Sequence, residues 1–183
     1  MQPIESLKSM PMRLMTIVLL ALLLPYSAMA QKKTSAASVS ITDRRFVEEA
    51  AAVLVAQIGD GIAESEPRIV FGKVSGGTGQ DAIVYFGYEG LSGGNSVHEY
   101  LAVYAAIPSR PGLSRSRPYR LAAVKLIGHR GWRSFDSTRI VIRNGVITIP
   151  GNYWKQEDAM CCPSGNISTT FKLQNGELVE VKK

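Results

Sequence analysis

From Arg68 onward the chain is a series of short runs rich in β-branched and aromatic residues, separated by glycine-rich turns. Asn-Gly pairs at 144–145 and 175–176 accept positive φ at both positions and are typical of tight hairpins. Because no second helical pattern of useful length separates the runs, parallel crossovers are not expected. The predicted strands are 69–74, 81–88, 99–107, 119–129, 139–143, 146–150, 167–173 and 178–181.

One helix is predicted ahead of these strands. Thr42 and Asp43 can cap its first turn, and apolar residues then recur every three or four positions as far as Ile58. A glycine-containing stretch at 59–61 ends the helix. The two patterns together predict an α+β domain in which one N-terminal amphipathic helix packs on a curved antiparallel sheet of seven or eight strands.

Residues 1–30 have the three-part layout of a secretory signal peptide: a basic start, an apolar run at 14–24 and small residues up to Ala30. The apolar run is shorter than the roughly 20 residues that a membrane-spanning helix needs. We therefore expect cleavage between Ala30 and Gln31, although an uncleaved anchor is the alternative. The mature protein would have a flexible N-terminus at 31–41, a single domain at 42–183 and no transmembrane span. Its location would be periplasmic or secreted, in a bacterium.

The two cysteines of the chain, Cys161 and Cys162, are neighbours. Consecutive Cα atoms lie about 3.8 Å apart, less than the span of about 4.4–6.8 Å in ordinary disulfides, so a bond between them requires a tight turn. The ring would close almost no chain and would add little loop-entropy stabilisation. Because exported compartments are oxidising, we predict a structural vicinal disulfide. Two buried free thiols, and a redox-active or intermolecular bond, are the alternatives.

A basic cluster lies before and at the start of one predicted strand, in a chain whose net charge is +6. Such a cluster can attract anionic headgroups, an anionic polymer or an acidic envelope protein. Nucleic acid is not an expected partner, because an exported protein rarely meets it and the loop offers one aromatic ring for stacking. A solvated loop without a partner is the alternative. The candidate residues for an anionic partner are Arg110, Arg115, Arg117 and Arg120.

Two glycine-rich loops resemble chemical sites only superficially. The loop 75–81 lacks the lysine and hydroxyl residue of a phosphate-binding loop, and its single carboxylate, Asp81, does not make a calcium loop. The loop 88–96 would suit a flexible binding edge. We interpret both as turns between strands.

No catalytic constellation is found in the sequence. His98 and His129 lie on different predicted strands without metal-motif spacing, and adjacent cysteines seldom both reach one tetrahedral ion. A soft ion such as Cu(I) on reduced thiolates, and a catalytic pair of one cysteine with His129, are alternatives. Neither a nucleophile elbow nor a glycosidase carboxylate pair is present. We therefore assign no catalytic, cofactor-binding or metal-ligating residue and expect no cofactor.

Several segments resemble a family of uncharacterised exported bacterial proteins: GTGQDA at 77–82, GGN at 93–95, YLAV at 100–103, NG at 144–145 and DAMCCPS at 158–164. These proteins share a D-x-M-C-C-P-S segment, followed by a strand and a closing Asn-Gly-x-Leu. The LppP/LprE-type lipoproteins are similar in the same C-terminal segment, although this chain has no cysteine near the expected cleavage site to carry a lipid. The resemblance implies export and a shared fold, and it implies no particular activity.

The sequence therefore predicts an exported soluble protein that binds or interacts with an unidentified ligand, and an enzyme is less expected. The alternative function is a thiol redox or soft-metal-handling envelope protein that uses Cys161 and Cys162.

Overall fold

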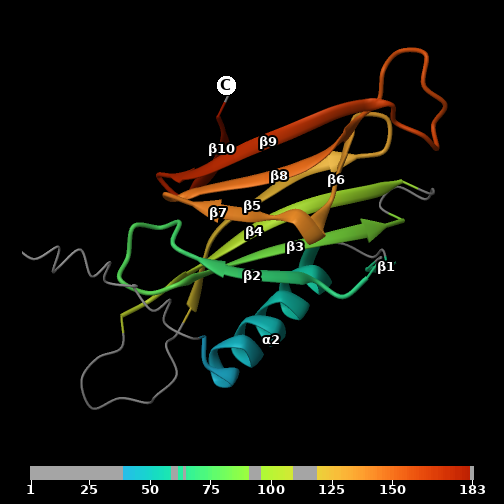
Figure 1. Cartoon of the computed structure of the whole chain (residues 1–183). Helices are drawn as coiled ribbons and strands as arrows, with labels where there is room; N and C mark the ends of the chain where they lie inside the picture. Colours follow the sequence, from blue (N-terminus) through green and yellow to red (C-terminus); the bar gives the residue numbers. More distant parts are fainter. Residues whose placement is uncertain (1–38, 59–61, 64, 91–95, 109–118, 182–183) are drawn as a thin grey trace, which may run out of the picture. The chain divides into compact units, whose positions relative to one another are not determined.

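The described residues fold into one α-helix followed by a large antiparallel sheet (Figure 1). The computed structural model describes residues 39–58, 62–63, 65–90, 96–108 and 119–181. The expected signal peptide, its Ala30–Gln31 cleavage site and most of the expected flexible N-terminus lie outside the described residues. The predicted α+β class is confirmed.

The described part of the sheet contains ten strands, so the predicted number of seven or eight is wrong. Each predicted segment overlaps an observed strand. The two additional strands, β1 and β6, have two and three residues, too few to show an alternating pattern. In chain order the elements are α2 (Ile41–Ile58), β1 (Ile62–Ala63), β2 (Arg68–Gly72), β3 (Asp81–Glu89), β4 (Val97–Ala106), β5 (Tyr119–His129), β6 (Arg133–Phe135), a 3-10 turn η1 (Ser137–Arg139), β7 (Val141–Arg143), β8 (Val146–Tyr153), β9 (Gly165–Gln174) and β10 (Glu177–Glu180).

The N-terminal cap of α2 is Ser40, and the predicted caps Thr42 and Asp43 are wrong. The Ser40 hydroxyl accepts a hydrogen bond from the backbone N–H of Asp43 at 3.0 Å. A cap must stand just before the first helical residue, where its side chain reaches an N–H of the first turn. Thr42 and Asp43 already lie inside that turn, where the Asp43 carboxylate favours the positive end of the helix dipole.

One face of α2 packs on the sheet. Val47, Ala51 and Leu54, spaced four and three residues apart, are buried in a cluster with Val84 and Phe86 of β3. Burial of a valine or leucine side chain stabilises a fold by about 1.5–3 kcal/mol. The exposed side of α2 carries two arginine–glutamate pairs with a spacing of four residues. The helix is therefore amphipathic and covers one face of the sheet.

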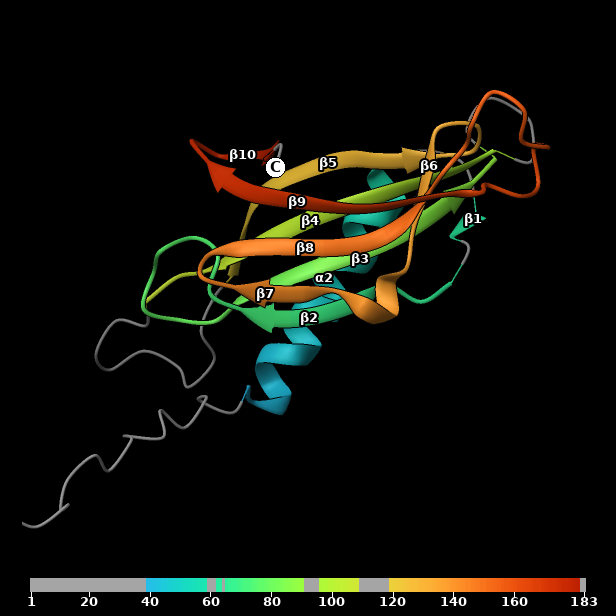
Figure 2. The same ribbon diagram turned by 45° about the horizontal axis from the view of Figure 1, so that its top comes forward.

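The sheet runs in the order β1-β3-β4-β5-β6-β8-β9-β10, and β2 and β7 pair with β3 and β8 respectively. All of these pairings are antiparallel. The two predicted Asn-Gly hairpins connect β7 to β8 and β9 to β10, with positive φ at each of their residues. Figure 2 shows that the sheet folds over, so that β7–β10 lie across β2–β5.

The main core lies between the two halves of this folded sheet. Ile83, Leu101 and Ile127 from β3, β4 and β5 are fully buried in one cluster with Ile149 of β8 and Phe171 of β9. The inner face of β3–β5 is thus covered by the sheet itself, and the outer face of β3 and β4 by α2.

Gly151 permits the change of partner along β8, which pairs with β7 at one end and with β6 at the other. A Cβ at this position would collide with the carbonyl oxygen of Ser134 and approach the backbone of Phe135. Only glycine therefore allows β6 to lie so close to β8.

Arg133 joins three strands where the sheet folds over. Its side chain is almost fully buried, and its two terminal nitrogens donate to the carboxylate oxygens of Glu180 on β10 at 3.0 and 2.8 Å. The Nε atom donates to the Ile127 carbonyl on β5. The guanidinium lies 3.9 Å from the ring centroid of Trp132, a distance typical of cation–π contact.

Asp81 organises the glycine-rich connection between β2 and β3, which is a hairpin turn as predicted. This carboxylate is 1% exposed. It accepts hydrogen bonds from the N–H groups of Val74 and Ser75 at 2.7 Å each, from the Ser75 hydroxyl at 2.8 Å and from the Ala106 N–H at 3.1 Å. Asp81 therefore fixes both the turn and the end of β4.

We predict that Asp81→Asn lowers the free energy of unfolding by about 2–3 kcal/mol, because a neutral amide accepts more weakly and its NH₂ group would face donors. Urea unfolding measures this change. The matched control is Glu177→Gln at an exposed position of β10, expected to change the value by less than about 0.5 kcal/mol. Equal stability of the two variants would contradict the role given to Asp81.

Candidate functional site

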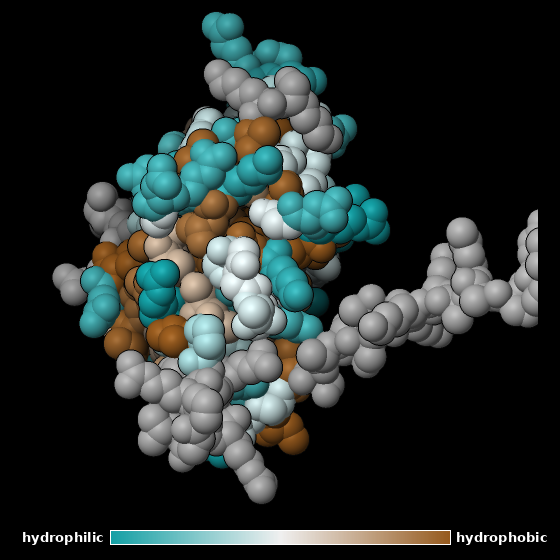
Figure 3. Space-filling model, turned by 90° about the vertical axis from the view of Figure 1, so that its left-hand side faces the viewer, coloured by the Kyte–Doolittle hydropathy of each residue, from teal (hydrophilic) through white to brown (hydrophobic). Residues whose placement is uncertain are grey.

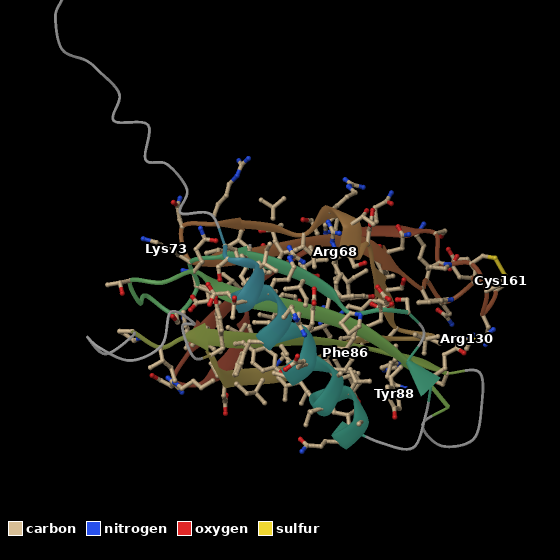
Figure 4. The ribbon with its side chains drawn as sticks, turned by 90° about the horizontal axis from the view of Figure 1, so that it is seen from below. Arg68, Lys73, Phe86, Tyr88, Arg130 and Cys161 are labelled. Atoms are coloured by element: carbon tan, nitrogen blue, oxygen red, sulfur yellow. A yellow bond between two sulfur atoms is a disulfide. The ribbon has the colours of Figure 1, made fainter. Side chains whose placement is uncertain are left out.

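The rarest side chains of the chain gather at one end of the sheet. The chain has two histidines, two tryptophans and two cysteines. The histidines are cross-strand partners at the ends of β4 and β5, and the Trp154 N–H donates to the Trp132 carbonyl at 3.1 Å. Figure 4 shows Arg130 and Cys161 together at this end, and Lys73 at the other. The β5–β6 and β8–β9 loops lie at this end, together with the end of β3 and the start of β4.

The opposite end carries the short hairpin turns and presents a mixed surface. Figure 3 shows this side, where hydrophobic areas lie next to hydrophilic ones. The histidine, tryptophan and cysteine residues therefore distinguish the end of the sheet that carries the β8–β9 loop.

Asp158 holds the β8–β9 loop in shape. Its Oδ2 accepts hydrogen bonds from the backbone N–H groups of Lys155 and Ser164 at 2.8 Å each. These two donors, first Lys155 and then Ser164, lower the pKa of Asp158 below its ordinary value because they stabilise the ionised form. The D-x-M-C-C-P-S segment is thus a loop closed by its own aspartate.

Cys161 and Cys162 form a vicinal disulfide with a Cα–Cα distance of 3.8 Å. Both residues are exposed. The alternative of two buried free thiols is therefore wrong for this structure, and neither cysteine offers a thiolate to a metal ion or to a substrate. Next to the disulfide, the carbonyl of Met160 accepts a hydrogen bond from Arg130 Nε at 3.2 Å, which ties the loop to the β5–β6 turn.

A cavity of about 450 Å³ opens between these two loops and the ends of β3 and β4. Its lining combines charged groups near the ends of β3, β4 and β5, Ser134 of β6, Val97 of β4 and side chains of the β8–β9 loop. The lining residues include Glu89, Glu99, Arg130, Trp154, Met160 and Cys161.

Glu99 is the most buried charged group of the cavity, with 6% of its surface exposed. Its Oε2 accepts a hydrogen bond from the Phe135 N–H at 2.9 Å. On the facing strand, a Cβ at Gly128 would lie 2.8 Å from the same oxygen. Glycine at 128 therefore makes room for a carboxylate that points between β5 and β6.

Trp154 has a fixed orientation in the wall of the cavity. Besides the main-chain hydrogen bond to Trp132, its indole Nε1 donates to the carbonyl of Ala159 at 3.2 Å. The same carbonyl accepts a hydrogen bond from the Cys162 N–H at 2.9 Å. The indole and the disulfide are thus held by one shared acceptor.

His98 and His129 lie opposite each other with ring centroids 5.9 Å apart. His129 Nδ1 lies 2.9 Å from the Arg130 carbonyl and therefore donates to it. Across the described residues, no group of three histidine, cysteine, aspartate or glutamate side chains could hold a metal ion. The soft-metal and cysteine–histidine alternatives both require reduced thiols and stay predictions.

The candidate patch for an anionic partner falls largely outside the described residues. Arg110, Arg115 and Arg117 belong to the part of the chain that is not described, whereas Arg120 is an exposed residue near the start of β5. The anionic partner stays a prediction.

Sequence reasoning missed Glu89, Glu99, Arg130 and Trp154 as members of one site. A signal existed for Glu99, because it occupies the same face of its strand as Leu101, which is buried in the core. A carboxylate at an inward position of a strand is costly to bury and indicates a special environment. The other three residues are brought together only by the folding of the sheet.

Comparison with known proteins assigns no family to the chain: no family model, no curated protein and no solved structure matches it. In the part of the chain that the structure describes, the helix lacks the combination of length and apolar character needed to cross a bilayer.

We predict that the loop keeps its shape well into the acid range. The folded-state pKa of Asp158 is lowered, so its contribution is present above the unfolded value of about 3.9 and is lost as pH falls through the lower folded value. The amide resonances of Lys155 and Ser164, followed by NMR, should titrate with a midpoint below about 3.9.

Asp158→Asn should remove this titration and perturb the Trp154 indole resonance at neutral pH. The matched control is Glu157→Gln, at the adjacent exposed position, which should leave both unchanged. Titration of the two amides at the ordinary aspartate pKa would show that Asp158 does not hold the loop.

Proposed function

We propose that the protein is an exported binding protein whose ligand occupies the cavity at the β8–β9 end of the sheet. The observation that carries this proposal is a buried carboxylate, Glu99, set in the wall of an open cavity of about 450 Å³ beside Trp154 and Met160. Ligand pockets typically combine apolar and aromatic walls with a few placed polar groups.

The cavity is also organised before any ligand arrives. Trp154 is held by two hydrogen bonds, Asp158 closes its loop, and Arg130 is tied to the Met160 carbonyl. Side chains that are already fixed lose less conformational freedom on binding, which favours affinity. Export is supported by the signal-like layout of residues 1–30, and an oxidising compartment suits a disulfide in the cavity wall.

Retention of small molecules tests this function. The purified protein is incubated with a low-molecular-weight extract of the bacterial envelope, washed and denatured, and the released compounds are identified by mass spectrometry. We expect the wild-type protein and Lys172→Gln, a control at an exposed position of β9, to retain the same compound. Trp154→Ala and the exposed-site variant Met160→Ala should each reduce its retention, by about threefold to tenfold.

Met160→Ala distinguishes loss of binding from loss of folding. Met160 is 57% exposed, so its truncation leaves no buried cavity and the variant should stay folded. A compound retained equally by all four proteins would place its binding elsewhere. No retained compound at all would speak against a small-molecule site.

A second candidate function, thiol redox exchange, is favoured by the exposure of both members of the disulfide. An external dithiol would break the Cys161–Cys162 bond, delivering two electrons and two protons to form two thiols while it becomes a disulfide itself. Neighbouring cysteines close almost no chain, so this exchange should leave the fold in place.

We predict that dithiothreitol reduces the bond in the folded protein, and that the free energy of unfolding then changes by less than about 1 kcal/mol. Alkylation followed by intact mass measurement should find both thiols modified without denaturant. The Cys161→Ala, Cys162→Ala double variant provides the unmodified control. Reduction that occurs only after unfolding would rule out the redox candidate and leave the binding proposal standing.

A further inference from the structure

We infer that the cavity at the β8–β9 end takes an organic cation, a substituted ammonium group carried on an apolar or aromatic body. This inference rests on the proposed function and names the chemical class of its ligand.

The charge of the cavity opposes that of the chain. The whole protein has a net charge of +6, yet the charged side chains that line the cavity, among the described residues, are two carboxylates, Glu89 and Glu99, and one guanidinium, Arg130. The cavity therefore has a net negative charge within a basic protein. Such a local reversal favours a positively charged ligand and disfavours an anion at short range.

The three charged side chains differ in their hydrogen bonds and in their exposure. Arg130 uses its Nε to hold the Met160 carbonyl, so this nitrogen already has a structural partner. Glu99 is fixed by the Phe135 N–H in a space that glycine at 128 leaves open. Glu89 is exposed at the end of β3. An ammonium group that enters the cavity would approach the buried carboxylate of Glu99 inside and the exposed carboxylate of Glu89 at the rim.

The apolar wall suits a cation as well. The Trp154 indole lines the cavity in an orientation fixed by its own Nε1 hydrogen bond, and tryptophan is the strongest aromatic partner for a cation. Met160 and the disulfide add polarisable sulfur surface without hydrogen-bond donors. A neutral sugar could stack on the same indole, but it offers no positive charge to the exposed Glu89 at the rim.

Three probe compounds that share a phenyl ring but differ in charge isolate the effect of charge on binding. Benzyltrimethylammonium, benzyl alcohol and benzoate are titrated separately into the ¹⁵N-labelled protein, and methyl β-glucoside tests the sugar. We expect the cation to bind about tenfold more tightly than the alcohol and benzoate to bind most weakly. The shifted resonances should be the Trp154 indole N–H and the amides of Glu89 and Met160.

Glu89→Gln should weaken binding of the cation by about threefold to tenfold and leave binding of the alcohol unchanged. Glu89 is exposed, so this variant should fold normally, and Glu177→Gln on β10 is the matched control with no expected effect on any probe.

The outcomes separate this inference from the proposed function. Alcohol, benzoate or glucoside binding at the cavity as tightly as the cation, or a cation affinity unchanged by Glu89→Gln, would overturn the inference and keep the cavity as a binding site. Absence of any shift at the cavity with all four probes, up to their solubility limits, would overturn the inference and would also contradict the proposed small-molecule site.

Discussion

The structure depends on one constraint: the antiparallel sheet has two apolar faces and α2 covers only one of them. The helix seals the outer face of β3 and β4 through residues such as Val47 and Leu54. The inner face is buried only because the sheet folds over and brings Ile149 and Phe171 onto it. Gly151 and Arg133 lie at this fold, where glycine permits close backbone approach and the buried arginine joins β5, β6 and β10. Burial of apolar surface thus determines which loops meet at the end of the sheet.

The two buried carboxylates show how polar groups are used in such a sheet. Asp81 accepts four hydrogen bonds from its own turn and from Ala106, so its charge is balanced by structure alone. Glu99 has a comparable burial but lies in the wall of a cavity, next to a glycine that leaves space for it. A buried charge is costly without compensation. The first carboxylate therefore explains the stability of a turn, and the second places a carboxylate in the wall of the cavity.

Most elements of the fold, but not the site, could be predicted from the sequence. Alternation and Asn-Gly pairs are local signals, and they correctly indicate the hairpins at Asn144 and Asn175. The sequence reading missed β6, with three residues, because so short a strand has no period, and it missed the cap Ser40 because two equally good capping residues follow it. The tight turn at Cys161 could be predicted from the sequence, because a disulfide between two adjacent cysteines requires one. The cavity joins residues from two loops and from the ends of β3 and β4, and their proximity follows from long-range packing that no local pattern encodes.

The opposition between a basic protein and an acidic cavity has a consequence for recognition. At low ionic strength, the net positive charge repels a small cation at long range and slows its approach. At physiological ionic strength this repulsion is screened beyond about 8 Å, whereas a partly buried carboxylate such as Glu99 is screened much less. Salt should therefore speed association while weakening mainly the contribution of the exposed Glu89. Selectivity for a cation would then come from short-range contacts inside the cavity, where Trp154 and Glu99 have fixed positions before binding.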